Sequence, residues 1–569
     1  MKRFHLTTNY ALINFNASLC DSEVHIVSSK SFEMVLAQYI RKLRLEKDAL
    51  IQSFKGIRIS MIHDAYKLLL IYDYQDIEKK NPALAPLVKK RKDFYRFTEN
   101  FYDYWRKIER IGMIIGNKRF PHQSLAEILI TQSDEFNQKI LFLYRTVTQK
   151  ILGKDFLTFR QLPAGVNANL VLLPHRFTYD PPYQHLQNIN FIQDMLTRPP
   201  FIIYSKSNKR EGLFKEIFEN PLASIELNKL HYICYPIKVG KLIAFVYIHR
   251  DFLHHGIALS NLFEPASYDE YEHKKPDLIY VYGVRENQFD CTYYKDLEHK
   301  HYIGVVSRFD KNDYFGYLKK MLLTLHNVYQ IDHNHLPIHG AMVKVLLKNN
   351  QEKNIAVIGD SGAGKSETLE ALRIIGKEYI KDMRVIFDDM GTFFIKNKEV
   401  YANGTEIGAF VRLDDLDAGY AYQEMDRAIF LNPDQTNARV ILPVSTYNFV
   451  VEDHKVDYLF YANNYIDTDQ GLTYYDDINE ALDVFKLGRR FAKGTTAEVG
   501  LVESYFANPF GPVQHKELTD PIINHVFKVL YQSKAKIGEL YTRLAIKGKQ
   551  MDGPQEAAKK LLQLLTKDA

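Results

Sequence analysis

The segment from Gly359 to Glu367 has the residue types and the spacing needed to hold phosphate groups. It fits the pattern G-x-x-x-x-G-K-[ST], in which glycines let backbone N–H groups approach phosphate oxygens closely. Lys365 would neutralise the β- and γ-phosphates, and the Ser366 hydroxyl would ligate Mg²⁺. The pattern therefore predicts a nucleotide-binding loop made of Gly359, Asp360, Ser361, Gly362, Ala363, Gly364, Lys365, Ser366 and Glu367.

Two neighbouring carboxylates, Asp388 and Asp389, directly follow a short apolar run at residues 385–387. A nucleotide-dependent phosphotransferase needs a carboxylate near the Mg²⁺ of its nucleotide, and the end of a strand beside a phosphate-binding loop can supply one. An acidic pair after a strand can also be a simple turn or helix cap. Because a phosphate-binding loop precedes this pair, we favour a metal-binding role for both residues.

The residues around the loop predict the elements that would position it. The apolar run at 355–358 is typical of a buried parallel strand, and Leu369, Leu372 and Ile375 recur at helical spacing after the loop. In a strand–loop–helix arrangement, backbone N–H groups at the start of the helix face an anion. Further apolar runs at 384–389, 408–413 and 439–442 alternate with loops and helices, which predicts an α/β nucleotide domain.

Length and composition limit the possible functions. A chain of 569 residues with 46% apolar residues can form two to four globular domains. Its 74 basic and 69 acidic side chains leave a net charge of only +5, which predicts no general affinity for nucleic acid. Three cysteines, Cys20, Cys234 and Cys291, lie far apart, which excludes a cysteine zinc site and is typical of a reducing compartment. With no run of 18 apolar residues and no signal-like N-terminus, we expect a cytoplasmic protein without a membrane partner; the oligomeric state stays open.

The spacing of apolar residues changes along the chain and predicts four segments. Residues 1–160 should form a mainly helical module, 161–335 a mixed α/β domain, 336–520 the nucleotide- and metal-binding domain, and 521–569 C-terminal helices. The last segment is expected to break at Gly553-Pro554 before a final short helix. Its helical spacing is carried by Val526, Val529, Leu530, Ile537, Leu540 and Leu544.

An aromatic stripe in the helical module allows two interpretations. It follows the basic run at residues 89–92 and consists of Phe94, Phe97, Phe101, Tyr104, Trp105 and Ile108. Basic residues beside aromatic side chains can form a nucleic-acid surface. A spacing of three and four residues is more typical of a buried helix face, so we expect core packing, with partner docking as the alternative.

Several segments resemble the phosphoenolpyruvate carboxykinases and the kinase of the histidine-containing phosphocarrier protein (HPr kinase), which share a nucleotide-binding core. The loop GDSGAGKSE, the preceding His339-Gly340 pair and the following Asp-Asp pair resemble HPr kinase. The segment YFGYLKK at 314–320 resembles the carboxykinase block Y-x-G-E-M-K-K. Lys320 precedes His339 by 19 residues, as the metal-binding lysine and histidine of that family do. Segments 436–443, 492–495 and 506–511 resemble further carboxykinase blocks.

The resemblance covers roughly residues 190–515 and implies roles for individual side chains. Lys320, His339 and Asp389 would hold a transition metal, usually Mn²⁺, and Ser366 and Asp388 would hold or orient the Mg²⁺ of ATP. The lysine ligand must be neutral, which a nearby dication can enforce by lowering its pKa.

The resemblance also implies the groups that would act on the transferred phosphoryl group. Lys365 and Arg439 would neutralise its charge. Tyr314 and Arg439 would line the acceptor pocket, and Thr495 would lie beside the nucleotide.

The acceptor side departs from the carboxykinase pattern in two places. The stretch G-R-S-P-K-D-K, whose arginine holds the carboxylate substrate in that family, is not found, and residues 494–500 lack the arginine of the block G-T-E-R-G. Arg58 or Arg198 could take that role. The sequence thus favours an ATP-dependent carboxykinase acting on oxaloacetate. The alternatives are a kinase for a protein or another small molecule, with the helical module as a docking unit, and a nucleotide-sensing regulator.

Overall fold

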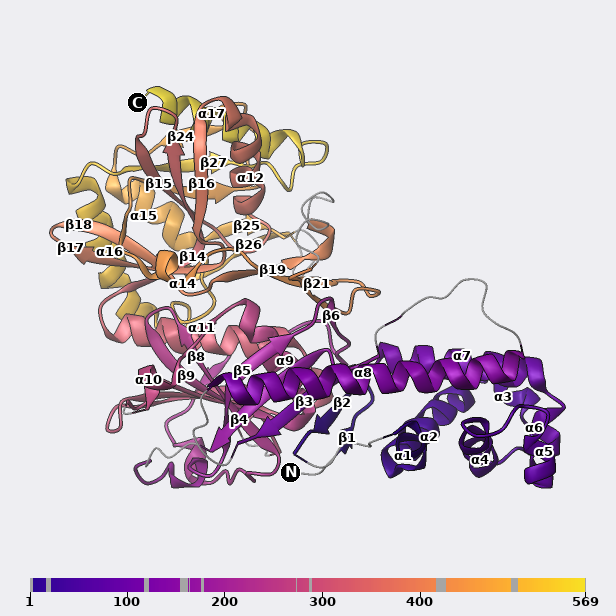
Figure 1. Ribbon diagram of the computed structural model, residues 1–569. Helices are drawn as coiled ribbons and strands as arrows, with labels where there is room; N and C mark the ends of the chain where they lie inside the picture. Colours follow the sequence, from indigo (N-terminus) through magenta and orange to yellow (C-terminus); the bar gives the residue numbers. More distant parts are fainter. Residues whose placement is uncertain are drawn as a thin grey trace. The chain divides into compact units, whose positions relative to one another are not determined.

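The computed structural model shows a mixed α/β protein (Figure 1). It describes residues 4–16, 22–116, 122–153, 162, 164–174, 179–272, 274–285, 289–415, 426–492 and 500–567. The chain divides into two compact units. The first consists of residues 1–175 and 190–204, and the second of residues 176–189 and 205–569. The predicted borders at residues 335 and 520 both fall inside the second unit.

The first unit combines helices with β-strands. Its strands are β1 (Phe4–Leu6), β2 (Tyr10–Asn14), β3 (Glu109–Ile115), β4 (Ala168–Pro174), β5 (Asn190–Thr197) and β6 (Phe201–Ile203). Its helices are α1 (Glu23–Ser28), α2 (Lys30–Leu45), α3 (Ala49–Ser53), α4 (Ile59–Leu69), α5 (Ile77–Lys80), α6 (Ala85–Val88), α7 (Arg91–Lys107) and α8 (His122–Leu152). Strands β2, β3 and β4 are parallel neighbours, and β1 and β5 pair antiparallel at either side.

The predicted apolar stripes form the core of this unit. In α2 the buried residues are Val35, Leu36, Tyr39, Ile40 and Leu43, and in α7 they include Phe94, Phe97, Phe101 and Trp105. The interpretation of the aromatic stripe as core packing is therefore confirmed. The long helix α8 contacts α1, α4 and α7 (Figure 1). Strand β3 was not expected within the helical module, because its short apolar run continues the helical spacing of α7.

The second unit begins with a sheet covered by helix α11. Its first elements are β7 (Lys215–Glu216), β8 (Tyr232–Val239), β9 (Leu242–His249), α9 (Leu253–Ala258), β10 (Glu264–Pro265), α10 (Tyr268–Tyr271), β11 (Leu278–Val284), β12 (Thr292–Asp296), β13 (His301–Ser307) and α11 (Phe315–Asp332). Strands β9, β11 and β13 run parallel, and β8 and β12 flank them antiparallel.

A second sheet carries the glycine-rich loop. Its strand order is β22-β18-β17-β14-β15-β23-β27-β24, with β16 paired to β14. The elements of this part are β14 (Leu336–Leu347), β15 (Glu352–Ile358), α12 (Lys365–Ile375), β16 (Ile380–Phe387), β17 (Met390–Lys396), β18 (Glu399–Gly404), β19 (Gly408–Arg412), β20 (Ile429–Leu431), β21 (Arg439–Pro443), α14 (Tyr447–Val451), β22 (His454–Lys455), β23 (Tyr458–Asn463), β24 (Leu472–Tyr474), α15 (Ile478–Leu487), β25 (Arg489–Phe491), β26 (Leu501–Glu503), α16 (Lys516–Gln532), β27 (Lys536–Tyr541) and α17 (Asp552–Lys567).

Helices cover both faces of this sheet, so alternate residues of one strand enter different cores. Along β15, Ile355 and Val357 pack in the core that contains α12 and α17, whereas Ala356 and Ile358 pack in the core that contains α15 and α16 (Figure 1). Burial on both faces explains why β15 appears in the sequence as a continuous apolar run.

The strands expected on either side of the loop are present. Strand β15 precedes it, β16 ends at Phe387 directly before the two aspartates, and β19 and β21 form an antiparallel pair. The expected helical tail is wrong in part, because residues 536–541 form strand β27, which pairs in parallel with β23. Ile537 and Leu540 have a spacing that suits a helix, yet a short run buried on both faces of a sheet cannot be told from a helix by its apolar pattern.

Within the described ranges, no helix combines the length and the apolar character that crossing a membrane requires.

We predict that Phe97→Ala lowers the free energy of unfolding of the first unit by about 3–5 kcal/mol. The Phe97 ring is buried, with its centroid 5.2 Å from that of Tyr39 and 5.3 Å from that of Phe54, and removing it leaves a cavity. The single tryptophan, Trp105, lies in the same unit, so its fluorescence during urea denaturation reports the change.

The matched control is Phe142→Ala in α8, because 57% of the Phe142 side chain is exposed. We expect it to change the free energy of unfolding by less than about 0.5 kcal/mol. Equal losses in the two variants would contradict the assignment of the aromatic stripe to the core.

Candidate nucleotide and metal site

The glycine-rich loop, residues 359–364, connects β15 to α12 in a tight turn. Gly362 and Gly364 have φ angles of 81° and 92°, which residues with a side chain rarely adopt. A Cβ atom at Gly364 would lie 2.6 Å from the side chain of Thr542, and the Thr542 hydroxyl donates a hydrogen bond to the Ala363 carbonyl at 2.6 Å. The end of β27 therefore supports the loop from behind.

Lys365 and Ser366 begin helix α12, as the sequence pattern requires. The Lys365 side chain is buried, and its Nζ donates to the Asp360 carbonyl at 3.2 Å. The Ser366 hydroxyl donates to Asp388 Oδ1 at 3.1 Å. The two oxygens expected to serve the Mg²⁺ of a nucleotide, from Ser366 and Asp388, are thus adjacent.

The Asp360 side chain interacts with two side chains from outside the loop. Its Oδ2 accepts a hydrogen bond from Arg490 Nε at 2.8 Å, and His339 Nδ1 lies 3.6 Å from its Oδ1. Burial would raise the pKa of Asp360, but His339 and Arg490 outweigh it and lower the pKa. Asp360 therefore stays ionised and holds the Arg490 guanidinium beside the loop. Of the other loop residues, Ala363 is buried, Ser361 is exposed and Glu367 lies in the first turn of α12; Thr495 lies outside the described residues.

A second cluster surrounds Asp389. Its Oδ2 lies 2.7 Å from Nζ of both Lys319 and Lys320, and its Oδ1 lies 3.1 Å from His339 Nε2. Lys319 also pairs with Glu406 at 2.9 Å. The lysines come from α11 and His339 from β14. The sequence-predicted residues Lys320, His339 and Asp389 are therefore brought together.

The hydrogen bonds of His339 fit a cation at this cluster. His339 Nδ1 lies 2.7 Å from the Ala507 carbonyl and must donate its proton to it. In the neutral imidazole, Nε2 then carries a lone pair that faces the Asp389 carboxylate. Two electron-rich atoms at this distance need a proton or a metal ion between them, and imidazole, carboxylate and a neutral amine are ligands that Mn²⁺ accepts.

The two lysines differ in their proton affinity. Burial would lower the pKa of Lys319, but Asp389 and Glu406 outweigh it and raise the pKa. Burial and the charge of Lys319 lower the pKa of Lys320 despite its contact with Asp389. Lys320 is therefore the lysine that gives up its proton more readily, as a metal ligand must.

The three carboxyl groups near the loop also titrate differently. Burial and the neighbouring Asp389 raise the pKa of Asp388 to about 6. Burial raises the pKa of Glu406 to about 7, although Lys319 opposes it. Burial would raise the pKa of Asp389 as well, but Lys319, Lys320 and His339 outweigh it, so that Asp389 stays ionised.

Tyr314 and Arg439 meet beside this cluster around the ring of Phe410. Tyr314 precedes α11, and its ring centroid lies 6.3 Å from that of Phe410. Arg439 begins β21, and its guanidinium carbon lies 5.3 Å from the centre of the same ring, with Lys319 Nζ at 5.5 Å. Burial raises the pKa of Tyr314, and Arg439 moderates the increase by its charge and a hydrogen bond.

Arg210 is a basic residue of this region that the sequence analysis missed. Its guanidinium carbon lies 5.3 Å from the centre of the Phe510 ring, and Lys320 Nζ lies 4.4 Å from the same ring. Burial lowers the pKa of Arg210, with opposing contributions from Tyr317, Cys291 and Tyr314. Arg210 therefore shares the Phe510 ring with Lys320 and lies close enough to Tyr314 to interact with it electrostatically. The two arginines considered earlier belong to the first unit, where Arg58 caps α4 and Arg198 pairs with Asp134 at 2.7 Å.

Glu406, Arg490 and Lys319 were also not predicted as site residues. Lys319 stands next to Lys320 in the matching segment, so the same motif could have indicated it. Glu406, Arg490 and Arg210 lie in segments without a motif, and only the fold brings them to the cluster.

A separate group of possible metal ligands, His254, His255 and Asp313, includes the residue directly before Tyr314. His255 Nε2 is 2.8 Å and His254 Nε2 is 3.6 Å from Asp313 Oδ1, and all three residues are buried. Asp313 Oδ2 also accepts the backbone N–H of Lys206 at 3.1 Å, and burial together with His254 lowers the pKa of His255 to about 4. These hydrogen bonds anchor the segment that leads to Arg210 against the start of α11.

No protein-family model matches the sequence, and no curated protein matches it at a significant level.

We predict that Lys365→Ala weakens ATP binding by about 10- to 150-fold, because the nucleotide loses a charge-assisted hydrogen bond. Titration with a fluorescent ATP analogue measures the dissociation constant. Lys377→Ala is the matched control, since Lys377 is exposed just beyond the end of α12. The loop assignment would be refuted by parental ATP affinity in Lys365→Ala.

We also predict a Mn²⁺ site at Asp389. Asp389→Asn should weaken Mn²⁺ binding at least about 100-fold, as should Lys320→Arg, which keeps the charge but cannot become a neutral ligand. Because a proton must leave Lys320, the affinity of the parent protein for Mn²⁺ should rise with pH. Electron paramagnetic resonance of free Mn²⁺ measures both effects.

Asp382→Asn, an exposed position on the neighbouring β16, serves as the control for this experiment. The assignment of Asp389 and Lys320 as ligands fails if their variants retain the Mn²⁺ affinity of the control.

Proposed function

We propose that this protein is an ATP-dependent phosphotransferase with a small anionic acceptor, similar in chemistry and in nucleotide domain to the phosphoenolpyruvate carboxykinases. One observation carries the proposal. The consecutive residues Asp388 and Asp389 each belong to a different cluster, since Asp388 contacts Ser366 and Asp389 contacts Lys319, Lys320 and His339. Two metal-binding groups beside one phosphate-binding loop suit the transfer of a phosphoryl group.

Different residues of the site would have different roles in the reaction. Backbone N–H groups of the loop and Lys365 would bind the β- and γ-phosphates of ATP, and Ser366 and Asp388 would hold Mg²⁺. Lys320, His339 and Asp389 would hold Mn²⁺, which would supply Lewis acidity to the acceptor oxygen. Lys319 keeps its positive charge through Asp389 and Glu406, and it would neutralise charge that develops during transfer.

The cationic residues on the acceptor side favour a dianion such as oxaloacetate. Arg210 and Arg439 would bind its carboxylates, with Tyr314 completing the pocket. Breaking the bond between C3 and the C4 carboxylate releases CO₂ and leaves the electron pair in an enolate. The enolate oxygen then bonds to the γ-phosphorus as the bond to ADP breaks, giving phosphoenolpyruvate and ADP. The half-buried Arg210 near Tyr314 supports this acceptor, because it could take the role of the missing arginine motif.

A second candidate is a kinase that phosphorylates a protein or another small molecule, as HPr kinase does. The observation that favours it is the separate first unit, which has its own core and no part in the motifs. Such a unit could recognise a protein acceptor. A nucleotide-sensing regulator without catalysis is disfavoured because the loop lysine and the residues of both clusters are retained.

We predict that the protein forms phosphoenolpyruvate from oxaloacetate only with ATP and Mn²⁺ or Mg²⁺ present. A coupled assay for phosphoenolpyruvate measures the rate. Arg210→Ala should raise KM for oxaloacetate by about 10- to 150-fold, through the loss of a charge-assisted hydrogen bond, and leave KM for ATP nearly unchanged. The control is Lys209→Ala, an exposed neighbour paired with Glu211 at 3.0 Å.

The carboxykinase proposal fails if ATP binds but oxaloacetate yields no phosphoenolpyruvate. Transfer of phosphate from ATP to a protein acceptor under the same conditions would then support the kinase alternative.

A further inference from the structure

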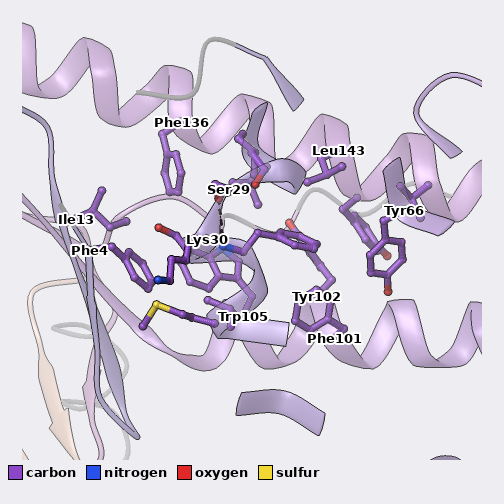
Figure 2. A pocket seen from close by; sticks show the side chains of 18 of the residues that line it. Phe4, Ile13, Ser29, Lys30, Tyr66, Phe101, Tyr102, Trp105, Phe136 and Leu143 are labelled. Atoms are coloured by element: carbon purple, nitrogen blue, oxygen red, sulfur yellow. Dashed lines mark hydrogen bonds between the residues drawn. The ribbon is translucent and has the colours of Figure 1, made fainter. Parts of the chain in front are cut away.

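A cavity of about 600 Å³ lies within the first unit, apart from the residues assigned to catalysis (Figure 2). It is surrounded by α1, α2, α4, α7 and α8 and by strands β1 and β2. Its volume is within the range of ligand-binding pockets, about 300–1,000 Å³. Aromatic rings form much of its wall, including Phe4, Phe32, Tyr66, Phe101, Trp105 and Phe136.

Most polar groups in this wall are already hydrogen-bonded to the protein. Tyr66 pairs with Thr98 at 3.1 Å, Tyr102 donates to the Leu162 carbonyl at 2.6 Å, Trp105 donates to the Ala164 carbonyl at 3.0 Å, and Tyr144 donates to Glu99 at 2.7 Å. A water molecule inside a protein needs two to four polar partners. The wall therefore offers apolar surface and few partners for water.

This combination points to an apolar occupant. Protein cores are packed as densely as organic crystals, with few voids larger than a water molecule. A space of this size with an aromatic wall gains free energy when an apolar group replaces water, by roughly 25 cal/mol for each Å² of apolar surface buried.

Lys30 gives the cavity a charged end. Its side chain is exposed at the first position of α2, and in the described part of the chain its ammonium forms no ion pair. Lys30 and Ser31, which both line the cavity, belong to the first turn of a 16-residue helix. The N-terminus of such a helix favours negative charge, so Lys30 and the helix attract the same kind of group.

We propose that the first unit binds a free long-chain fatty acid, with the acyl chain in the aromatic cavity and the carboxylate at Lys30. The ligand class follows from the two halves of the site, an apolar chamber and one cationic end. This binding is independent of the phosphotransferase activity proposed above.

The test uses 11-(dansylamino)undecanoic acid, whose fluorescence increases in an apolar environment. We expect saturable binding of one molecule to the full chain and displacement by oleate. Methyl oleate should compete about two- to fivefold more weakly, because it has no charge for Lys30. Phosphatidylcholine vesicles should not displace the probe, which separates a free fatty acid from a lipid surface.

Two variants locate the site. Leu143→Trp places a larger ring in the cavity and should abolish probe binding, while thermal melting checks that the protein is still folded (Figure 2). Lys30→Glu should weaken oleate binding by about tenfold and remove the preference over methyl oleate. Arg41→Glu, an exposed charge reversal on the same helix outside the cavity, should leave both unchanged.

If Leu143→Trp does not fold, Lys30→Glu still tests the proposal, because it changes only an exposed residue. The proposal is overturned if the parent protein shows no saturable binding, if only vesicles displace the probe, or if Lys30→Glu keeps the preference for oleate over its ester.

Discussion

The carboxylate of Asp389 is the group on which the second unit most depends. A carboxylate that is largely withdrawn from water destabilises the fold unless charges and hydrogen bonds compensate it, and the Asp389 side chain is 26% exposed. Here the compensation comes from two consecutive lysines of α11 and from a histidine of β14, so that one side chain ties a helix to the sheet. The interaction explains why Lys319 can be buried and its neighbour Lys320 largely covered in α11, a helix with almost no exposed face. It also places positive charge beside the glycine-rich loop, as the proposed binding of a polyanion would require.

The parts of the site that the sequence predicted are those with a local pattern. The glycine spacing of the loop, the strand that ends before Asp388 and the helix that starts at Lys365 lie within one stretch of about 30 residues, where backbone geometry alone imposes the residue types. The convergence of Lys320 and His339 on Asp389 was predicted only through a resemblance, because no periodicity connects a helix residue to a strand residue across a turn. Arg210 and Glu406 escaped prediction because only tertiary packing brings them to the cluster.

In the fold as well, elements with a local sequence pattern could be predicted, and elements that depend on distant parts of the chain could not. The helical stripes of α2 and α7 repeat every three or four residues, and their buried faces could be predicted from that repeat. Strand β27 could not, since β23 and β24 pair along its edges and its two faces pack into two different cores, through Ile537 and Leu540. The cavity between α2, α7 and α8 could not be predicted either, because its size depends on five helices and two strands together. No single stretch of sequence contains that information.

The support of the glycine-rich loop by Thr542 has a consequence for the order in which the protein is made. The hydrogen bond between Thr542 and Ala363 joins residues 179 positions apart, and β27 follows every other strand in the described part of the chain. A ribosome therefore releases the loop long before the residues that hold it in shape. Until then, β23 lacks the parallel partner that covers its edge, and an uncovered strand of apolar residues invites pairing with other chains. Nascent chains of this protein should accordingly depend on chaperones until residues 536–542 emerge, and removal of β27 should cause aggregation rather than partial activity.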